Sequence, residues 1–345
     1  MLSALITAPP NSRAICNAIS DLPPAVGPPM TTMFSRRPGF SRRPGSPAAR
    51  FAGALNPVRS PSTPTGYPSS AQPLSPAMSH FVTLIANPAL PRLSDGTVTS
   101  ARWALEDAGA EGGEPDWLSP QVACDIPFAG GDPGAAQAAV RDSVGRLPVD
   151  VVVTGAENRR KRLLVADMES TVIRNEMVDD LADLLGVGET VRRITQQAMN
   201  GEIPFREALA VRVELLGGLE KEFLQAFCYR IEFTPGARTL VRAMRKEGAL
   251  ATLVSGGFRI YSEFVRRECG FDIDVANDVV VDGGVLTGQL VHPVLGAQGK
   301  LEAMDAFLAD RGLSRQDALA VGDGATEIPM LQAAGAGVAF RAKPA

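Results

Sequence analysis

The 345-residue chain has only two histidines and four cysteines, and it lacks an apolar run near the roughly 18 residues that span a membrane. The cysteines are Cys16, Cys124, Cys228 and Cys269. Their spacing fits neither a metal-binding pair nor a dense disulfide framework, so we expect free thiols in a reducing, cytoplasmic setting. His80 is expected to open a strand, and His292 precedes Pro293 in an expected turn. This scarcity disfavours histidine-based zinc sites and Ser-His-Asp triads.

Charge is also sparse and unevenly distributed. The net charge is −4, but residues 1–77 hold seven Arg and one Asp without Lys or Glu, which gives +6 and leaves −10 for the rest. An acidic body argues against a nucleic-acid partner. Apolar residues make up 45% and charged residues 21%, which is typical of a globular protein without membrane spans.

Residues 1–77 hold 15 of the 27 prolines and include the basic repeat SRRPGFSRRPGSP. Such a segment buries too little apolar area to offset the entropy lost on ordering. We therefore expect a disordered or non-native extension. Two alternatives are an organelle transit peptide and a true start at Met78.

Residues 78–157 are expected to form a small α+β domain of regulatory type, resembling ferredoxin-like and ACT-like units. The expected order is strand 80–86, helix 95–108, strand 122–128, helix 134–145 and strand 149–153. This β-α-β-α-β pattern suggests helices on one face of a sheet. The following segment GAENRRKR, residues 155–162, is expected to be a solvated linker.

Three short apolar runs mark the main domain, residues 158–345. They are LLVA at 163–166, ALATLV at 249–254 and ALAV at 318–321. Continuous apolar runs of this length are typical of strands buried on both faces, so the fold class is a doubly wound parallel α/β sheet. The helical insertion at about 175–232 is expected to form a cap, and residues 278–289 a β-hairpin.

Each apolar run leads directly into polar or glycine residues: DMEST at 167–171, SGG at 255–257 and GDG at 322–324. Ligands of open parallel sheets bind at the carboxyl ends of the strands, so these groups should converge there. Asp167 can act as a nucleophile that forms an acyl-phosphate. Asp167 and Asp323, with a backbone carbonyl near Glu169, can hold Mg²⁺, and Glu169 can serve as general acid and base.

Three further groups suit a phosphate. Ser255 and the N–H of Gly256 can hold phosphate oxygens, and Lys300 supplies a fixed positive charge. Each motif alone is more simply a helix cap, a turn or a surface lysine. Their joint occurrence at three strand ends favours phosphoryl transfer.

In their order and spacing these motifs resemble the haloacid dehalogenase (HAD) superfamily, and within it the phosphoserine phosphatase family, over residues 78–345. The four motifs are DMEST at 167–171, SGGF at 255–258, Lys300 and GDGATE at 322–327. The resemblance implies a HAD-like Rossmannoid core and Mg²⁺-dependent hydrolysis of O-phosphoserine through an aspartyl-phosphate, the last step of serine biosynthesis. It also implies a small-molecule substrate, with a homodimer as an option.

The cap carries the residues that would select the substrate. By resemblance, Glu176 pairs with the substrate ammonium and Arg212 with its carboxylate, for which a bidentate guanidinium is well suited. Met199 and Phe205 would shield the site from water. The plainer alternative is that Arg212 is an exposed helical charge and Phe205 a core residue.

The chain departs from the family pattern at three positions. Glu169 stands where the family has Asp, and Thr326 and Glu327 stand where it has Asn and Asp; Thr326 takes the substrate-contacting position. The chain also ends at Lys343-Pro344-Ala345, where the family usually continues through a final helix and strand, so the sheet is expected to lack an edge element. These departures keep two alternatives open: a non-catalytic protein that binds a phospho-amino acid, and a phosphatase for another small phosphomonoester.

Overall fold

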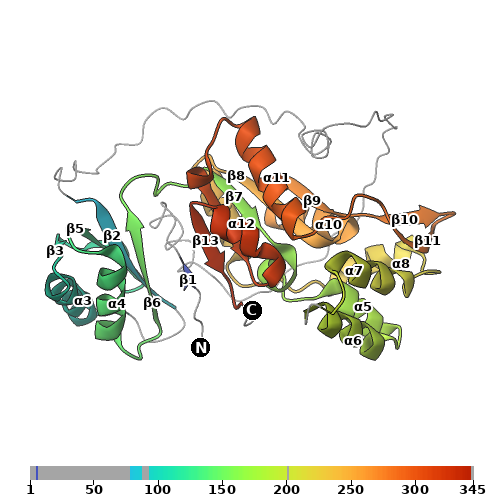
Figure 1. Ribbon diagram of the computed structural model, residues 1–345, viewed down its shortest axis with the longest axis horizontal. Coiled ribbons are helices and arrows are strands. Elements are labelled where there is room, and N and C mark those ends of the chain that lie inside the picture. Colours follow the sequence, from blue (N-terminus) through green and yellow to red (C-terminus); the bar gives the residue numbers. More distant parts are fainter. Residues whose placement is uncertain (1–4, 7–77, 88–92, 200–201, 343–345) are drawn as a thin grey trace.

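The chain forms two sheets with separate cores, joined by a short connection (Figure 1). The computed structural model describes residues 5–6, 78–87, 93–199 and 202–342. The expected extension over residues 1–77 lies outside the described residues, except for β1 (Leu5–Ile6). Among the described residues, every helix is too short or too polar to cross a membrane.

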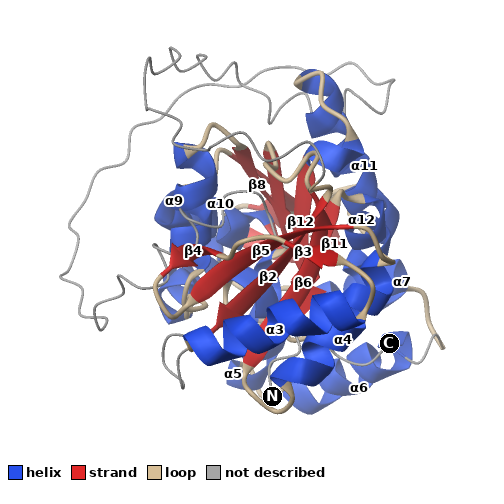
Figure 2. Cartoon of the chain, turned by 90° about the vertical axis from the view of Figure 1, so that its left-hand side faces the viewer, coloured by secondary structure: helices blue, strands red, loops and turns tan. Residues whose placement is uncertain are grey.

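The first sheet is antiparallel, with strand order β3-β5-β2-β6 and β4 paired to β5. Its strands are β2 (His80–Ala86), β3 (Glu111–Gly112), β4 (Asp116–Ser119), β5 (Ala123–Ala129) and β6 (Val149–Gly155). Helices α3 (Asp95–Asp107) and α4 (Pro133–Val144) lie side by side on one face (Figure 2). Ser94 and Asp132 cap them by accepting a backbone N–H of the first turn. The expected β-α-β-α-β order is present, with β3 and β4 added; a domain boundary near 157/158 stays a prediction.

The second sheet has strand order β1-β13-β12-β7-β8-β9. Its remaining strands are β7 (Leu163–Ala166), β8 (Leu250–Phe258), β9 (Ile273–Asn277), β12 (Ala318–Gly322) and β13 (Ala336–Ala339). All neighbours from β13 to β9 pair in parallel, and β1 pairs antiparallel with β13. Strand β13 continues the sheet beyond β12, and the expectation of a missing edge element after residue 345 stays a prediction.

Helices cover both faces of this sheet: α9 (Ala237–Lys246), α10 (Arg259–Cys269), α11 (Ala297–Asp310) and α12 (Ile328–Ala333). Strand β7 shows why its sequence is apolar throughout. Leu164 and Ala166 join the core beneath α9 and α10, whereas Leu163 and Val165 join the core beneath α11 and α12. Successive side chains of a strand point to opposite faces, so a strand buried on both faces needs an apolar residue at every position. The predicted doubly wound α/β fold is confirmed.

The cap consists of α5 (Met177–Leu184), α6 (Gly188–Met199), α7 (Phe205–Glu214), α8 (Lys221–Phe227) and the turn η2 (Cys228–Arg230). The hairpin of β10 (Val279–Asp282) and β11 (Val285–Leu290) lies against it (Figure 1). Leu286 donates its backbone N–H to Leu219 and accepts that of Gly218. The cap is therefore attached to the sheet domain by its two chain connections and by this hairpin.

The connection between the two sheets, residues 155–162, is exposed at most positions as expected, but two of its charged side chains are largely buried. Arg159 donates to Asp125 over 2.8 Å, and both side chains are largely buried. The buried Lys161 donates to the carbonyl of Gln316 over 2.8 Å. Two charged side chains, one residue apart, therefore anchor the connection to the first sheet and to the segment before β12.

Candidate active site

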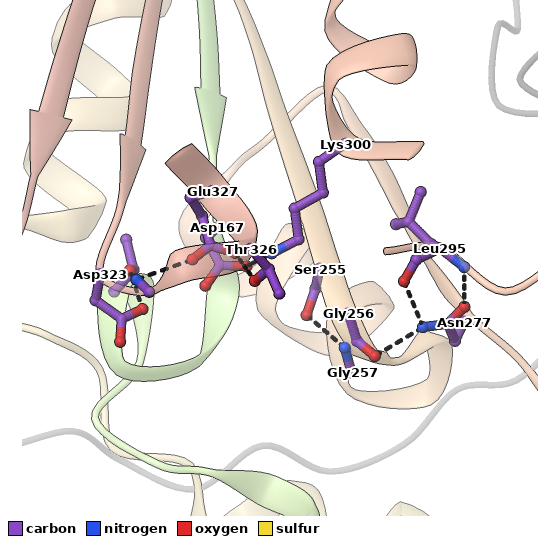
Figure 3. A network of polar contacts seen from close by, with 12 residues as sticks. Asp167, Ser255, Gly256, Gly257, Asn277, Leu295, Lys300, Asp323, Thr326 and Glu327 are labelled. Carbon is purple, nitrogen blue, oxygen red and sulfur yellow. Dashed lines mark hydrogen bonds and ion pairs between the residues drawn. The ribbon is translucent and has the colours of Figure 1, made fainter. Parts of the chain in front are cut away.

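Three parallel strands end at the same edge of the sheet, and the predicted chemical groups meet there (Figure 3). Asp167 directly follows β7, Asp323 directly follows β12, and Ser255 lies near the end of β8. The first turn of α11 brings Lys300 to this edge, where its ammonium group contacts Asp167. Residues that are up to 156 positions apart in the sequence are thereby brought together.

Asp167 is held firmly at this edge. Its backbone N–H donates to the carbonyl of Val321 over 2.9 Å, and its Oδ1 accepts from Lys300 over 2.6 Å. The side chain is only 8% exposed. Burial raises the pKa of Asp167 to about 7, and the positive charge of Lys300 opposes this rise. Because a carboxylate must be ionised to attack phosphorus, Lys300 or a bound cation favours the reactive form.

Lys300 also forms an ion pair with Glu327, one of the residues that depart from the family motif. Glu327 is buried and receives two more hydrogen bonds, from the Thr326 hydroxyl over 2.5 Å and from the Gly324 N–H over 2.9 Å. Burial alone would raise its pKa, but Lys300 lowers it, so Glu327 is held ionised. A Cβ at Gly322 would collide with the first carbons of the Glu327 side chain, so this glycine allows the close approach of residue 327.

Three buried carboxylates form the part of the site that suits a cation. Oxygens of Asp167, Asp323 and Glu327 lie within 4.8 Å of one another. With Lys300 they sum to a charge of −2 (−3 + 1), and buried uncompensated charge is costly. Oxygen donors are the ligands that Mg²⁺ takes, so the residues present fit this ion. The side chain of Glu169, whose neighbourhood was predicted to supply a ligand, is not part of this group.

Glu169 lies in an irregular turn, η1 (Met168–Val172), in which Ser170 takes the left-handed conformation with φ of 52°. Its Oε1 accepts the backbone N–H of Met177 over 2.8 Å, at the start of the cap. Its Oε2 would lie 2.7 Å from a Cβ placed at Gly257, so a larger residue at position 257 would displace the Glu169 carboxyl group. Burial, aided by the nearby Glu176, raises the pKa of Glu169 to about 8. A protonated carboxyl group at neutral pH is what a general acid requires.

The predicted phosphate-binding residues lie in a bulge of β8. The ladder between β8 and β9 pairs Val254 with Val275 and then Phe258 with Asn277, so three residues of β8 stand opposite a single residue of β9. Ser255 is buried, and its Oγ accepts the N–H of Gly257 over 3.0 Å. The bulge pushes residues 255–257 out of the regular ladder.

The predicted cap residues lie on α6 and α7 and directly before α5. Glu176 precedes α5 and accepts a hydrogen bond from Ser170 over 2.7 Å. Arg212 on α7 has a guanidinium nitrogen 3.8 Å from Asp179 and is 14% exposed, so the alternative of an exposed helical charge is wrong. Phe205 begins α7 and lies 3.3 Å from the Cβ position of Gly256. Met199 ends α6, and its side chain lies outside the described residues.

Two residues of the site were missed by the sequence analysis. Thr171 donates to Asp323 over 3.1 Å and so links the ends of β7 and β12. Asn277 is buried and makes three hydrogen bonds to the loops around the site. Thr171 lies within the first motif and could have been inferred from it, whereas an Asn-Asp pair after a strand is indistinguishable from an ordinary turn.

Comparisons with known proteins agree with this geometry. The haloacid dehalogenase-like hydrolase family matches residues 164–332. A phosphoserine phosphatase from Archaeoglobus fulgidus is 39% identical over 206 residues, which cover 59% of this chain and 60% of the relative. One from Streptococcus thermophilus is 39% identical over 184 residues, covering 53% and 86% respectively. The crystal structure of a probable phosphoserine phosphatase from Vibrio cholerae aligns with a TM-score of 0.61 at 25% identity, covering 77% of this chain and 79% of that one.

The family match over residues 164–332 includes nearly all of β7, the cap that follows it, and β8, β9 and β12. The chain spans less than two thirds of the length of the A. fulgidus relative but most of the S. thermophilus one. A doubly wound sheet with an aspartate, a lysine and an acidic group at its carboxyl edge defines the class. The chain belongs to the haloacid dehalogenase-like hydrolases and, within them, to the phosphoserine phosphatase family.

Proposed function

We propose that this chain hydrolyses O-phosphoserine to serine and phosphate in a Mg²⁺-dependent reaction, as the last step of serine biosynthesis. The observation that carries the proposal is the contact of Lys300 with Asp167 at 2.6 Å, beside Asp323 at the carboxyl edge of the sheet. Mg²⁺ would be held by Asp167 and Asp323. When bound, it would neutralise the charge of the phosphate and of these carboxylates.

The protein residues divide the reaction into two steps. An oxygen of Asp167 attacks phosphorus, the bond from phosphorus to the serine oxygen breaks, and the protonated Glu169 gives its proton to that oxygen. In the second step a water attacks the phosphorus of the acyl-phosphate. Glu169, now ionised, accepts the proton of the water, and the phosphorus–oxygen bond to Asp167 breaks. The raised pKa of Glu169 supports the first of its two roles.

The cap supports phosphoserine as the substrate. Glu176 and Arg212 lie close enough to Glu169 to influence its pKa in opposite directions. An acid and a guanidinium at this place are the partners that the ammonium and carboxylate groups of an amino acid require. Phe205 and Met199 would then exclude water when the cap is closed.

The alternative of a non-catalytic binding protein was motivated by Glu169, Thr326 and Glu327. All three have partners in the site, and Glu327 retains an ion pair with Lys300. This argues for adapted catalytic residues. A phosphatase for another small phosphomonoester stays an alternative, which the ratio of kcat/KM for phosphoserine to that for phosphothreonine and sugar phosphates decides.

Phosphate release from phosphoserine with Mg²⁺ tests the proposal. We expect release by the wild type and none with excess EDTA or in Asp167→Asn, while the exposed Asp310→Asn keeps full activity. Phosphoserine binding without turnover would instead favour the binding protein. A cytoplasmic location and a homodimer stay predictions, for cell fractionation and light scattering to test.

A further inference from the structure

The side chain of Asn277, at the end of β9, joins two loops of the site (Figure 3). Its Nδ2 donates to the carbonyl of Gly256 over 2.7 Å and to that of Leu295 over 3.2 Å, and its Oδ1 accepts the N–H of Leu295 over 2.6 Å. The partners fix the orientation of the amide, because carbonyls only accept and an N–H only donates. Asn277 is 2% exposed, so this amide has exchanged water for backbone partners.

The first loop is the bulge of β8. Asn277 holds the carbonyl of Gly256, and Ser255 accepts the N–H of Gly257 over 3.0 Å. These two groups belong to one peptide unit, which is planar. Holding both of its ends fixes the orientation of that unit, and with it the course of the turn proposed to receive the phosphate.

The second loop leads into α11. Leu295 precedes Gly296, whose carbonyl accepts the N–H of Lys300 over 3.0 Å. The ring of Phe205, on the cap, lies over both loops: its nearest carbons are 3.3 Å from the Cβ position of Gly256 and 3.4 Å from that of Gly296. One buried amide therefore sets the spacing of the two surfaces on which this cap residue rests.

We propose that Asn277 is a positioning residue for phosphoryl transfer, and this rests on the proposed function. Its amide holds the turn at residues 255–257 and the start of α11 at a fixed separation. It thereby aligns Gly256 with Lys300. It also positions Gly256 and Gly296, the two residues on which the ring of Phe205 packs. Asn277 itself acts through these groups.

Asn277→Asp is the most direct variant, since it keeps the shape and the acceptor for Leu295 but removes both donors. Asn277→Ser is a second, neutral variant should the first fail to fold. Thr252→Val is the matched control: Thr252 is also fully buried, and its hydroxyl donates to the carbonyl of Leu164 over 2.9 Å, away from both loops. For each protein, kcat, KM, the Kd of orthophosphate by calorimetry and the midpoint of urea unfolding are measured.

We expect kcat/KM of the Asn277 variants to fall about 10- to 100-fold, the effect of displacing reacting groups by about 1 Å, and orthophosphate to bind more weakly. Thr252→Val should unfold at a lower urea concentration than the wild type, yet keep the kcat/KM and the orthophosphate Kd of the wild type. The proposal is overturned if either Asn277 variant keeps kcat/KM and the phosphate Kd within twofold of the wild type, or if Thr252→Val loses as much kcat/KM as the Asn277 variants.

A wild type that binds orthophosphate without turnover contradicts the proposed function alone, and the comparison of phosphate Kd still decides the role of Asn277. A wild type that binds no orthophosphate contradicts both.

Discussion

Glu169 shows how a single longer side chain is accommodated in this site. The family motif has an aspartate here, and the extra methylene would displace the carboxyl group if the surroundings were unchanged. Instead, Oε1 accepts the N–H of Met177 at the start of the cap, and Gly257 leaves space for Oε2. The site is therefore shaped around the longer acid.

We expect Glu169→Asp to lower kcat by at least about tenfold. The shorter side chain no longer accepts the N–H of Met177, and its carboxyl group lies farther from the reacting oxygen by about one carbon–carbon bond. Steady-state kinetics on phosphoserine measure this. Glu169→Gln keeps the length of the side chain but cannot transfer the proton, so its kcat should be lower still. A higher kcat for Glu169→Asp would show that the longer arm is a handicap.

Thr326 and Glu327 act as a pair, since the hydroxyl of Thr326 donates to the carboxylate oxygen that also accepts from Lys300. Thr326→Val removes this donor, and Glu327→Asp shortens the acceptor. Both should lower kcat/KM, and the double variant should differ from the sum of the single effects by about 0.5–3 kcal/mol, as residues in contact do. Kinetics of the four proteins of the cycle measure the coupling. Additivity within about 0.5 kcal/mol would contradict a shared role.

At the scale of elements, a half-buried acid on β6 makes stability depend on pH. Burial raises the pKa of Asp150 to about 6, although Arg141 opposes the rise, and an unfolded Asp titrates near about 3.9. The folded state thus binds more protons between these values. Stability is greatest below about pH 3.9 and falls as the pH rises to about 6, as far as this group contributes.

Asp150→Asn should therefore unfold at a higher temperature than the wild type at pH 7, with the difference shrinking as the pH is lowered to 4. Thermal unfolding followed by circular dichroism measures both proteins across this range. Asp142→Asn, at an exposed position of α4, is the control. A difference that does not change with pH would contradict the role of burial at Asp150.

The elements that could be predicted from the sequence are those whose burial produces a recognisable apolar pattern. Strands β7 and β12 lie where apolar runs were noted, because burial on both faces demands such runs. The two-residue strand β3 was missed because it is specified by pairing with β5 rather than by its own residues. The SGG segment was expected to follow a strand, yet β8 continues through it to Phe258, since a bulge permits glycines inside a strand.

The same distinction holds for the site. Asp167 and Asp323 could be placed together because strand ends share one edge of the sheet, and Lys300 was added because the phosphate needs a fixed positive charge. The contact of Asn277 with Gly256 depends on how far β8 bulges, and no local pattern encodes that. Arg159 was assigned to a solvated linker because its basic neighbours resemble one; its burial depends on Asp125, 34 residues earlier.

For the whole molecule, Arg159 is one of the two largely buried side chains that anchor the connection between the sheets. Its guanidinium group contacts Asp125, which is 5% exposed, and lies 4.1 Å from the ring centre of Phe81. Arg159→Ala leaves the buried Asp125 carboxylate without its positively charged partner, although the Thr83 hydroxyl still donates to it over 2.6 Å. We expect the free energy of unfolding to fall by about 3–5 kcal/mol.

Urea denaturation measures this loss, with Arg160→Ala as the control. Arg160 is the next residue, is 66% exposed and pairs with Glu247 at 3.5 Å. Its substitution should change stability by less than about 1 kcal/mol. Equal effects of the two substitutions would mean that burial of the Arg159 pair contributes nothing.

Lys161 completes this picture, because it is fastened to Gln316 just ahead of β12, the strand that ends at Asp323. Arg159 and Lys161 are separated only by Arg160, which itself pairs with Glu247 over 3.5 Å. Because three consecutive side chains of the connection have partners, we expect the smaller sheet to move little relative to the larger one. A displacement of the smaller sheet would therefore act first on the start of β12, the strand that is followed directly by Asp323.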